Sequence, residues 1–129
     1  RLTAKYLSIS FDFYRNASHS LNQVFNICEA EGYKRLILCG LSELTEIATI
    51  RALDHPLEII GIYQPGSEKH KALNLPVWNK ILPEGHFDAC VITALDNPMN
   101  MYELLGKQVN EELIFIPSIL GIKDNNHLN

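Results

Sequence analysis

Residues 34–64 read KRLILCG, LSELTEIATIRAL, DHP and LEIIGIYQ, in that order. This is an unbroken apolar run, a turn at Gly40, an amphipathic segment and a second apolar run. The pattern predicts a buried strand over 35–39, then a helix, then a second buried strand over 57–63. A strand–helix–strand unit of this kind joins parallel strands by a crossover that is nearly always right-handed.

The helix of this unit is predicted to begin after Ser42 and to end before Pro56. Serine is a good N-cap residue, and the residue before a proline avoids helical dihedral angles. Gly40 is expected to make the tight turn ahead of the helix, because glycine has the backbone freedom that such turns need. The residues expected to face the sheet are Leu44, Ile47, Ala48, Ile50 and Leu53.

Three further strands are predicted downstream, over 75–78, 88–93 and 113–117. Residues 67–73 are compatible with a short helix. Pro98 can open a helix that continues to residue 109, with Asn97 or Asp96 as its cap. Placed with right-handed crossovers, the five strands take the order 3-2-1-4-5. The expected fold is therefore a Rossmann-like three-layer α/β/α sandwich around a mostly parallel five-stranded sheet.

A long helix is predicted ahead of the first strand. From about residue 10 the apolar positions recur every three or four residues, and Gly32 is well placed to stop the helix. The predicted organisation is thus a linker or dimerisation helix over 1–32, the Rossmann-like domain over 33–122 and a flexible tail over 123–129. The aromatic residues near the helix start, Phe11, Phe13 and Tyr14, are interpreted either as a partner-facing surface or as ordinary core packing.

The bulk composition narrows the function classes. The chain has 129 residues, a net charge of -4 and no cluster of lysine or arginine, so a nucleic-acid footprint is missing. No apolar run is long enough to span a membrane. The three cysteines do not pair in close spacing, which favours buried free thiols in a reducing cytoplasm. Because the chain begins with Arg1, it is expected to be a piece of a longer protein.

A ligand crevice is predicted where the strand order reverses, between the first and fourth strands. The turns after these strands, 40–43 and 93–96, are expected to face each other, with Gln64 nearby. The candidate ligand-binding residues are Gly40, Leu41, Ser42, Glu43, Gln64, Thr93, Ala94 and Asp96. The backbone amides of Ser42 and Glu43 are expected to point outward, toward a ligand.

The motifs for known chemistry are incomplete. Only the first glycine of a dinucleotide fingerprint is present, and Glu43 would compete with a phosphate, so NAD binding in the standard way is not expected. Ser42 lacks the surroundings of a nucleophile elbow and is interpreted as a helix cap. Glu43 and Asp96 could form an acid–base pair or be two solvated caps. The five histidines show no metal-ligand spacing. These observations predict a non-enzymatic domain without a metal, for which a nucleotide-type ligand remains possible.

The segments KRLILCG (34–40), SELTEIA (42–48), IIGI (59–62), LPV (75–77) and FDACVIT (87–93), with Leu53, carry a family resemblance. Across 34–116 the chain resembles the Rossmann-like domain that follows a winged helix-turn-helix in certain bacterial transcriptional regulators. It is also similar to CoA-binding and nucleotide-sugar-binding Rossmann-like domains. The first resemblance implies a cytoplasmic, non-catalytic domain that senses a small-molecule effector, forms a homodimer, or does both. DNA would be contacted only through a domain outside this chain. The alternative is a nucleotide-, nucleotide-sugar- or CoA-binding module of a sugar-modifying enzyme.

Overall fold

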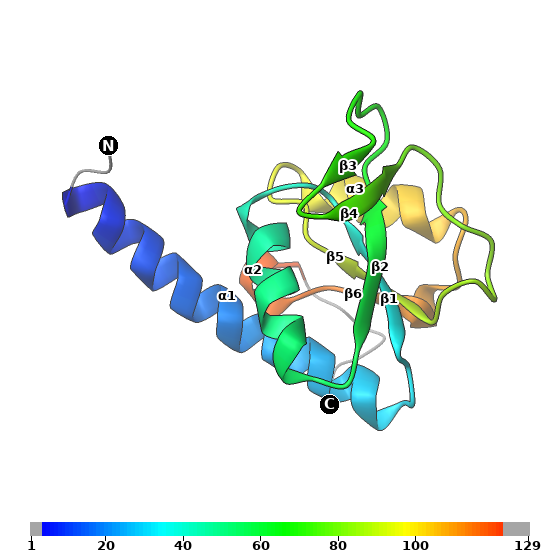
Figure 1. Ribbon diagram of the computed structural model, residues 1–129, viewed down its shortest axis with the longest axis horizontal. Coiled ribbons are helices and arrows are strands. Elements are labelled where there is room, and N and C mark those ends of the chain that lie inside the picture. Colours follow the sequence, from blue (N-terminus) through cyan, green and yellow to red (C-terminus); the bar gives the residue numbers. More distant parts are fainter. Residues whose placement is uncertain (1–3, 123–129) are drawn as a thin grey trace.

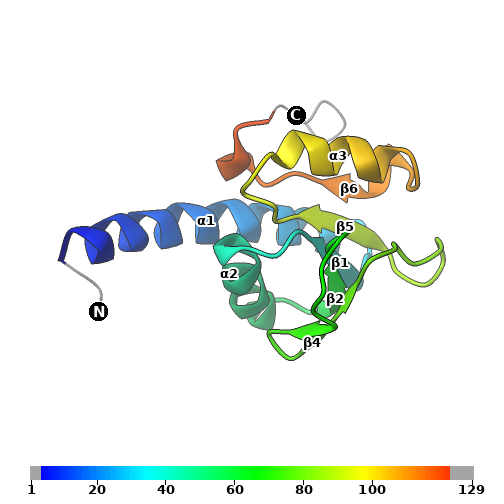
Figure 2. The same cartoon turned by 90° about the horizontal axis from the view of Figure 1, so that it is seen from above.

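The protein is an α/β structure, described for residues 4–122 by a computed structural model (Figures 1 and 2). The helices are α1 (Ala4–Ala30), α2 (Glu43–Arg51) and α3 (Pro98–Gly106). The strands are β1 (Arg35–Cys39), β2 (Glu58–Tyr63), β3 (Lys71–Ala72), β4 (Leu75–Trp78), β5 (Ala89–Ile92) and β6 (Ile114–Phe115). Short 3₁₀ helices cover η1 (Ala52–Asp54), η2 (Glu111–Leu113) and η3 (Ser118–Leu120). The predicted tail, 123–129, lies outside the described residues.

The sheet is mixed and mostly parallel, and it has six strands in the order β3-β4-β2-β1-β5-β6. The prediction of five strands in the order 3-2-1-4-5 is therefore corrected. The added strand, β3, pairs antiparallel with β4 at the sheet edge, so the segment 67–73 contains a strand and not the short helix with which its sequence is compatible. Its tight turn uses Leu73 and Asn74, both at positive φ, instead of the glycine-containing pairs that usually mark such turns. The other pairs are parallel.

The sheet separates two apolar cores. On one face, Leu36 and Leu38 of β1 pack in a cluster that also holds buried residues of α1 and α2. On the other face, Ile37 and Cys39 belong to a cluster that includes Met101 of α3. Side chains alternate between the faces of a strand, so β1 is covered on both sides, as its unbroken apolar run predicted. Helices α1 and α2 therefore pack on one face of the sheet and α3 on the other.

Helix α1 ends at Ala30, and Gly32 stops it as the sequence predicted. The amide of Tyr33 donates to the carbonyl of Cys28 at 2.9 Å, and that of Gly32 donates to Glu29 at 3.0 Å. With Gly32 at φ +82°, this is a Schellman motif. The N-terminal half of the helix projects beyond the sheet (Figure 1).

The α3 face of the sheet is covered unevenly. Between β2 and β4 the chain forms a loop and the β3 hairpin instead of a helix. Over β2, the indole of Trp78 occupies the space that a helix would otherwise cover. The ring lies so close to the strand that a Cβ on Gly61 would be only 2.4 Å from it. Glycine at 61 is thus a packing requirement: it lets the large ring lie against the strand backbone.

Two expected core residues of α2 lie at the surface. Leu44, Ile47 and Ala48 are buried as predicted, but Ile50 is 41% exposed and Leu53 is 83% exposed. The α-helix ends at Arg51 and continues as the 3₁₀ helix η1. Ile50 still belongs to α2, where it lies on the opposite side of the helix from the buried Ala48. Leu53 lies in η1, where the winding is tighter, and Ala52 supplies the next buried contact.

Candidate functional site

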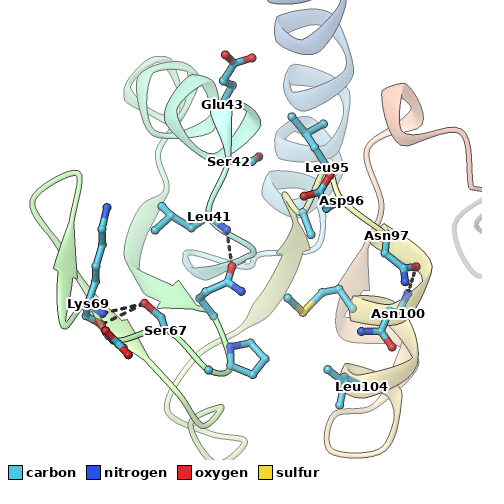
Figure 3. A pocket seen from close by; sticks show the side chains of 16 residues that line it. Leu41, Ser42, Glu43, Ser67, Lys69, Leu95, Asp96, Asn97, Asn100 and Leu104 are labelled. Carbon is cyan, nitrogen blue, oxygen red and sulfur yellow. Dashed lines mark hydrogen bonds between the residues drawn. The ribbon is translucent and has the colours of Figure 1, made fainter.

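A pocket of about 980 Å³ opens at the carboxyl ends of the parallel strands. Figure 3 shows its lining, which comes from the turns after β1, β2 and β5 and from the start of α3. Six of the predicted site residues line it: Leu41, Ser42, Glu43, Gln64, Ala94 and Asp96. Gly40 and Thr93 are instead buried and absent from the lining. The pocket lies where the strand order reverses, as expected of ligand sites in open α/β sheets.

Gly40 allows the turns after β1 and β5 to meet. Its φ is +117°, and a Cβ built on it would lie 2.5 Å from the Cα of Ala94. Its amide donates to the carbonyl of Tyr63 at 2.9 Å. The tight turn expected at this position is therefore present, and it depends on the missing side chain as well as on backbone freedom.

Two buried threonines hold the Gly40 turn from behind. The Thr45 hydroxyl donates to the Gly40 carbonyl at 2.6 Å, and the Thr93 hydroxyl donates to the same carbonyl at 2.8 Å. The two hydroxyl oxygens lie 2.9 Å apart, and both residues are fully buried. The Gly40 carbonyl is within hydrogen-bonding distance of both buried hydroxyls, and this network holds the turn behind the pocket wall.

Ser42 is the N-cap of α2, as predicted. Its Oγ accepts from the amide of Leu44 at 3.1 Å and donates to the carbonyl of Thr93 at 2.6 Å. Its own amide donates to Thr45 Oγ1 at 2.9 Å, which completes a capping box. The prediction that the Ser42 amide points outward to a ligand is therefore wrong, because a side chain three residues later binds it.

Gln64 performs a similar task for the turn after β1. Its Oε1 accepts a hydrogen bond from the Leu41 amide at 2.8 Å, as drawn in Figure 3. Other amides of lining residues are bound in the same way: Gly66 by Asn79 Oδ1, Lys69 by Ser67 Oγ and Asn100 by Asn97 Oδ1. Amides of this kind form the usual cradle for phosphate groups. Here several of them already bind oxygen atoms of the protein.

The charged side chains of the lining are mostly acidic. Glu43, Glu68 and Asp96 contribute carboxylates, and Lys69 contributes one ammonium group. A second hollow of about 540 Å³ shares Leu41, Ser42, Glu43 and Lys69 with the pocket and continues past His70 and Lys71. Any ligand of the main pocket thus meets a carboxylate-rich wall.

Sequence reasoning missed two parts of the lining, the loop after β2 and the residues just before and within α3. These residues are Pro65, Gly66, Ser67, Glu68, Lys69, Leu95, Asn97, Asn100, Met101 and Leu104. The loop after β2 carried a usable signal, because parallel strands end at the same edge of a sheet. The α3 residues carried none, since their inclusion depends on how the helix lies on the sheet.

The cysteines are buried free thiols. Burial raises the pKa of the Cys28 thiol to about 12, and the carboxylates of Glu31 and Glu29 act in the same direction. Burial also holds the pKa of Cys39 well above its usual value, with Cys90 as a neighbour. Thiolates are the reactive form of cysteine, so Cys28 and Cys39 are poorly suited to nucleophilic or redox chemistry.

Within residues 4–122, no group of three or more His, Cys, Asp and Glu side chains is arranged to hold a metal ion. None of the helices in this range is long and apolar enough to cross a membrane. Comparison with known protein families, with curated proteins and with solved structures finds no match to this chain.

Proposed function

We propose that this chain is the non-catalytic, ligand-sensing and dimerising domain of a bacterial transcriptional regulator, with a Rossmann-like fold and a cytoplasmic location. The observation that carries the proposal is the pocket of about 980 Å³ at the carboxyl ends of β1, β2 and β5. A pocket of this size and place suits a small-molecule effector. The hydroxyls of Ser42, Thr45 and Thr93 bind the protein itself, which supports sensing over catalysis.

The lining favours an effector without free phosphate groups. Glu43, Glu68 and Asp96 repel an anion, and only Lys69 attracts one. A phosphate at the β1 turn would also have to displace Gln64 from the Leu41 amide. A neutral polar or cationic compound would meet the carboxylates favourably instead.

The second candidate is a nucleotide-, nucleotide-sugar- or CoA-binding module of an enzyme. The position of the pocket at the strand-order reversal favours it, since nucleotides bind there in many α/β sheets. It would require the ligand to use atoms other than the amides of Leu41 and Ser42, because Gln64 and Thr45 occupy these amides.

A thermal-shift screen of the full chain tests the proposal. The panel contains sugars, amino acids and polyamines beside nucleotides, NAD(P)(H), nucleotide sugars and CoA. A ligand that binds only the folded state stabilises it by about 2.7 kcal/mol at a hundredfold excess over its dissociation constant. We expect a concentration-dependent shift from a compound without phosphate groups. A shift from phosphorylated compounds alone would support the second candidate, and no shift at all would contradict ligand sensing.

A matched pair of variants on α3 ties any shift to the pocket. Asn100 lines the pocket, whereas the neighbouring Met99 is 44% exposed and absent from the lining. Asn100→Trp fills the pocket and should abolish the shift. Met99→Trp adds the same ring outside the pocket and should leave the shift unchanged. Equal shifts in the two variants would place the ligand elsewhere.

A further inference from the structure

The α1 segment over 11–15 carries apolar side chains that the domain leaves largely uncovered. Among the α1 side chains described, which start at residue 11, the first buried one is Ala17, while Phe11 is 66% exposed and Tyr14 is 37% exposed. Figures 1 and 2 both show this half of the helix extending beyond α2 and the sheet. Large exposed aromatic side chains on a helix usually mark an interaction surface when they gather in one place.

These aromatic residues do gather, because they form one wall of a groove with α2. The groove has a volume of about 390 Å³. Its α1 wall is Phe11, Phe13 and Tyr14, and its α2 wall is Glu43, Glu46, Ile47 and Ile50. Ile50 is one of the two residues that the sequence placed wrongly in the core, and its 41% exposure becomes part of this surface. The groove is thus apolar along its length with carboxylates on the α2 side.

Beside Phe11, α1 carries one anion, Asp12, and one cation, Arg15, and the cation suits the carboxylates of the groove. Arg15 stands one turn after Phe11 with its guanidinium 5.9 Å from the ring centre. Its ion pair with Asp12, at 3.1 Å, joins two side chains that are 68% and 63% exposed. Such surface pairs are weak and exchange easily. In an apolar groove with an acidic edge, the ring of an aromatic–arginine pair can contact the apolar wall, and the arginine can face the acidic edge. In this groove the acidic edge is Glu46.

We infer that the start of α1 from one copy of this chain packs into the α1–α2 groove of a second copy, forming a two-fold dimer. Each copy carries both the aromatic–arginine segment and the acidic apolar groove, as a two-fold interface requires. Phe11 of one copy contacts Ile47 and Ile50 of the other, and Arg15 faces Glu46. The inference deepens the dimerising part of the proposed function and rests on it, but it does not depend on the ligand.

Sedimentation velocity of the full chain, over a wide range of protein concentration, tests the apolar contact. We expect a reversible dimer for the wild type and a dissociation constant at least about tenfold weaker for Phe11→Ala, the loss of about 1.4 kcal/mol of binding. Met99→Ala, which truncates an exposed side chain on α3, is the matched control and should dimerise like the wild type. A monomeric wild type, or a Phe11→Ala variant that dimerises normally, overturns the inference.

A charge exchange tests the geometry. Arg15→Glu should weaken the dimer at least about tenfold, and so should Glu46→Arg. The double variant carries the opposite pair and should recover most of the wild-type affinity. Failure of the double variant to recover overturns the placement of Arg15 against Glu46. Melting temperatures are compared at a protein concentration where every protein, the wild type included, is monomeric, and equal values there show that the variants are folded. Since dimerisation is measured without ligand, a monomeric chain that still shows a pocket-dependent thermal shift would refute the dimer and leave ligand sensing intact.

Discussion

Gly40 combines a φ of +117° with a Cβ position only 2.5 Å from the Ala94 backbone. Gly40→Ala must therefore both strain its own backbone and push apart the turns after β1 and β5. We expect a loss of about 3–5 kcal/mol in the free energy of unfolding, measured by urea denaturation. Gly85→Ala is the matched control, because Gly85 has a φ of +98° but open space around it, and about 1 kcal/mol is expected there. Similar losses in both variants would show that the close approach to Ala94 does not matter.

The pKa of Cys28 makes stability depend on alkaline pH. In the unfolded chain the thiol ionises near its ordinary value of 9.0, whereas in the folded chain its pKa is about 12. Between these values the unfolded state binds fewer protons, so the stabilising effect is complete below pH 9 and is lost as the pH rises toward 12. We expect urea-unfolding free energies to fall less steeply over this range in Cys28→Ala than in the wild type. Parallel losses in the two proteins would contradict the assignment.

Residues of the site were predictable where their contacts are local. Ser42 caps α2 through amides within three positions of it, so its role can be read from a short segment. Gln64 accepts from an amide 23 positions away, and the residue type alone does not indicate that partner. The prediction that the Ser42 amide points outward was wrong for a related reason. The Thr45 side chain accepts a hydrogen bond from this amide, and threonine is not the residue that usually marks the third position of a capping box.

At the scale of elements, periodicity identified the helices and the long strands but not the places where winding or pairing changes. Ile50 lies within α2, where a rotation of about 100° per residue puts it on the opposite side of the helix from the buried Ala48. Leu53 lies in η1, after the winding has changed. Strand β3 has only two residues and a turn without glycine, so it carries too little pattern to be recognised. The first error concerns which face of α2 is buried and the second a two-residue strand, and in both cases tertiary packing overrides the local pattern.

Trp78 of β4 packs directly on Gly61 of β2, so these two residues should be energetically coupled. Gly61→Ala should destabilise the wild type by about 1–3 kcal/mol, because the new methyl group meets the indole. In a Trp78→Ala background the space is open, and the same change should be neutral or stabilising. Unfolding free energies of the four proteins form a double-mutant cycle. A Gly61→Ala effect that is the same in both backgrounds would mean that the two residues are not coupled.

For the whole molecule, the strand topology was sufficient to predict where a pocket would open. The strand order reverses beside β1, and the pocket lies at the carboxyl ends there. The wall supplied by α3 and the groove between α1 and α2 could not be predicted, because each depends on how a helix lies against another element. Phe11, Phe13 and Tyr14, for which the sequence left two interpretations open, separate in the structure: Phe13 packs partly against the core, while Phe11 and Tyr14 are exposed.

The burial pattern divides the molecule at Ala17, and a truncation series should reveal this division. Residues before it contribute exposed or half-buried side chains over 11–16, whereas Ala17 and Leu21 are fully buried against the sheet. A chain lacking residues 1–15 should therefore melt within a few degrees of the wild type but lose self-association in sedimentation. A chain lacking residues 1–22 also loses two core contacts and should be destabilised by about 3 kcal/mol or more. If the shorter truncation unfolds as readily as the longer one, the start of α1 supports the fold of the single copy. If it remains dimeric, the surface that joins two copies lies outside the α1–α2 groove.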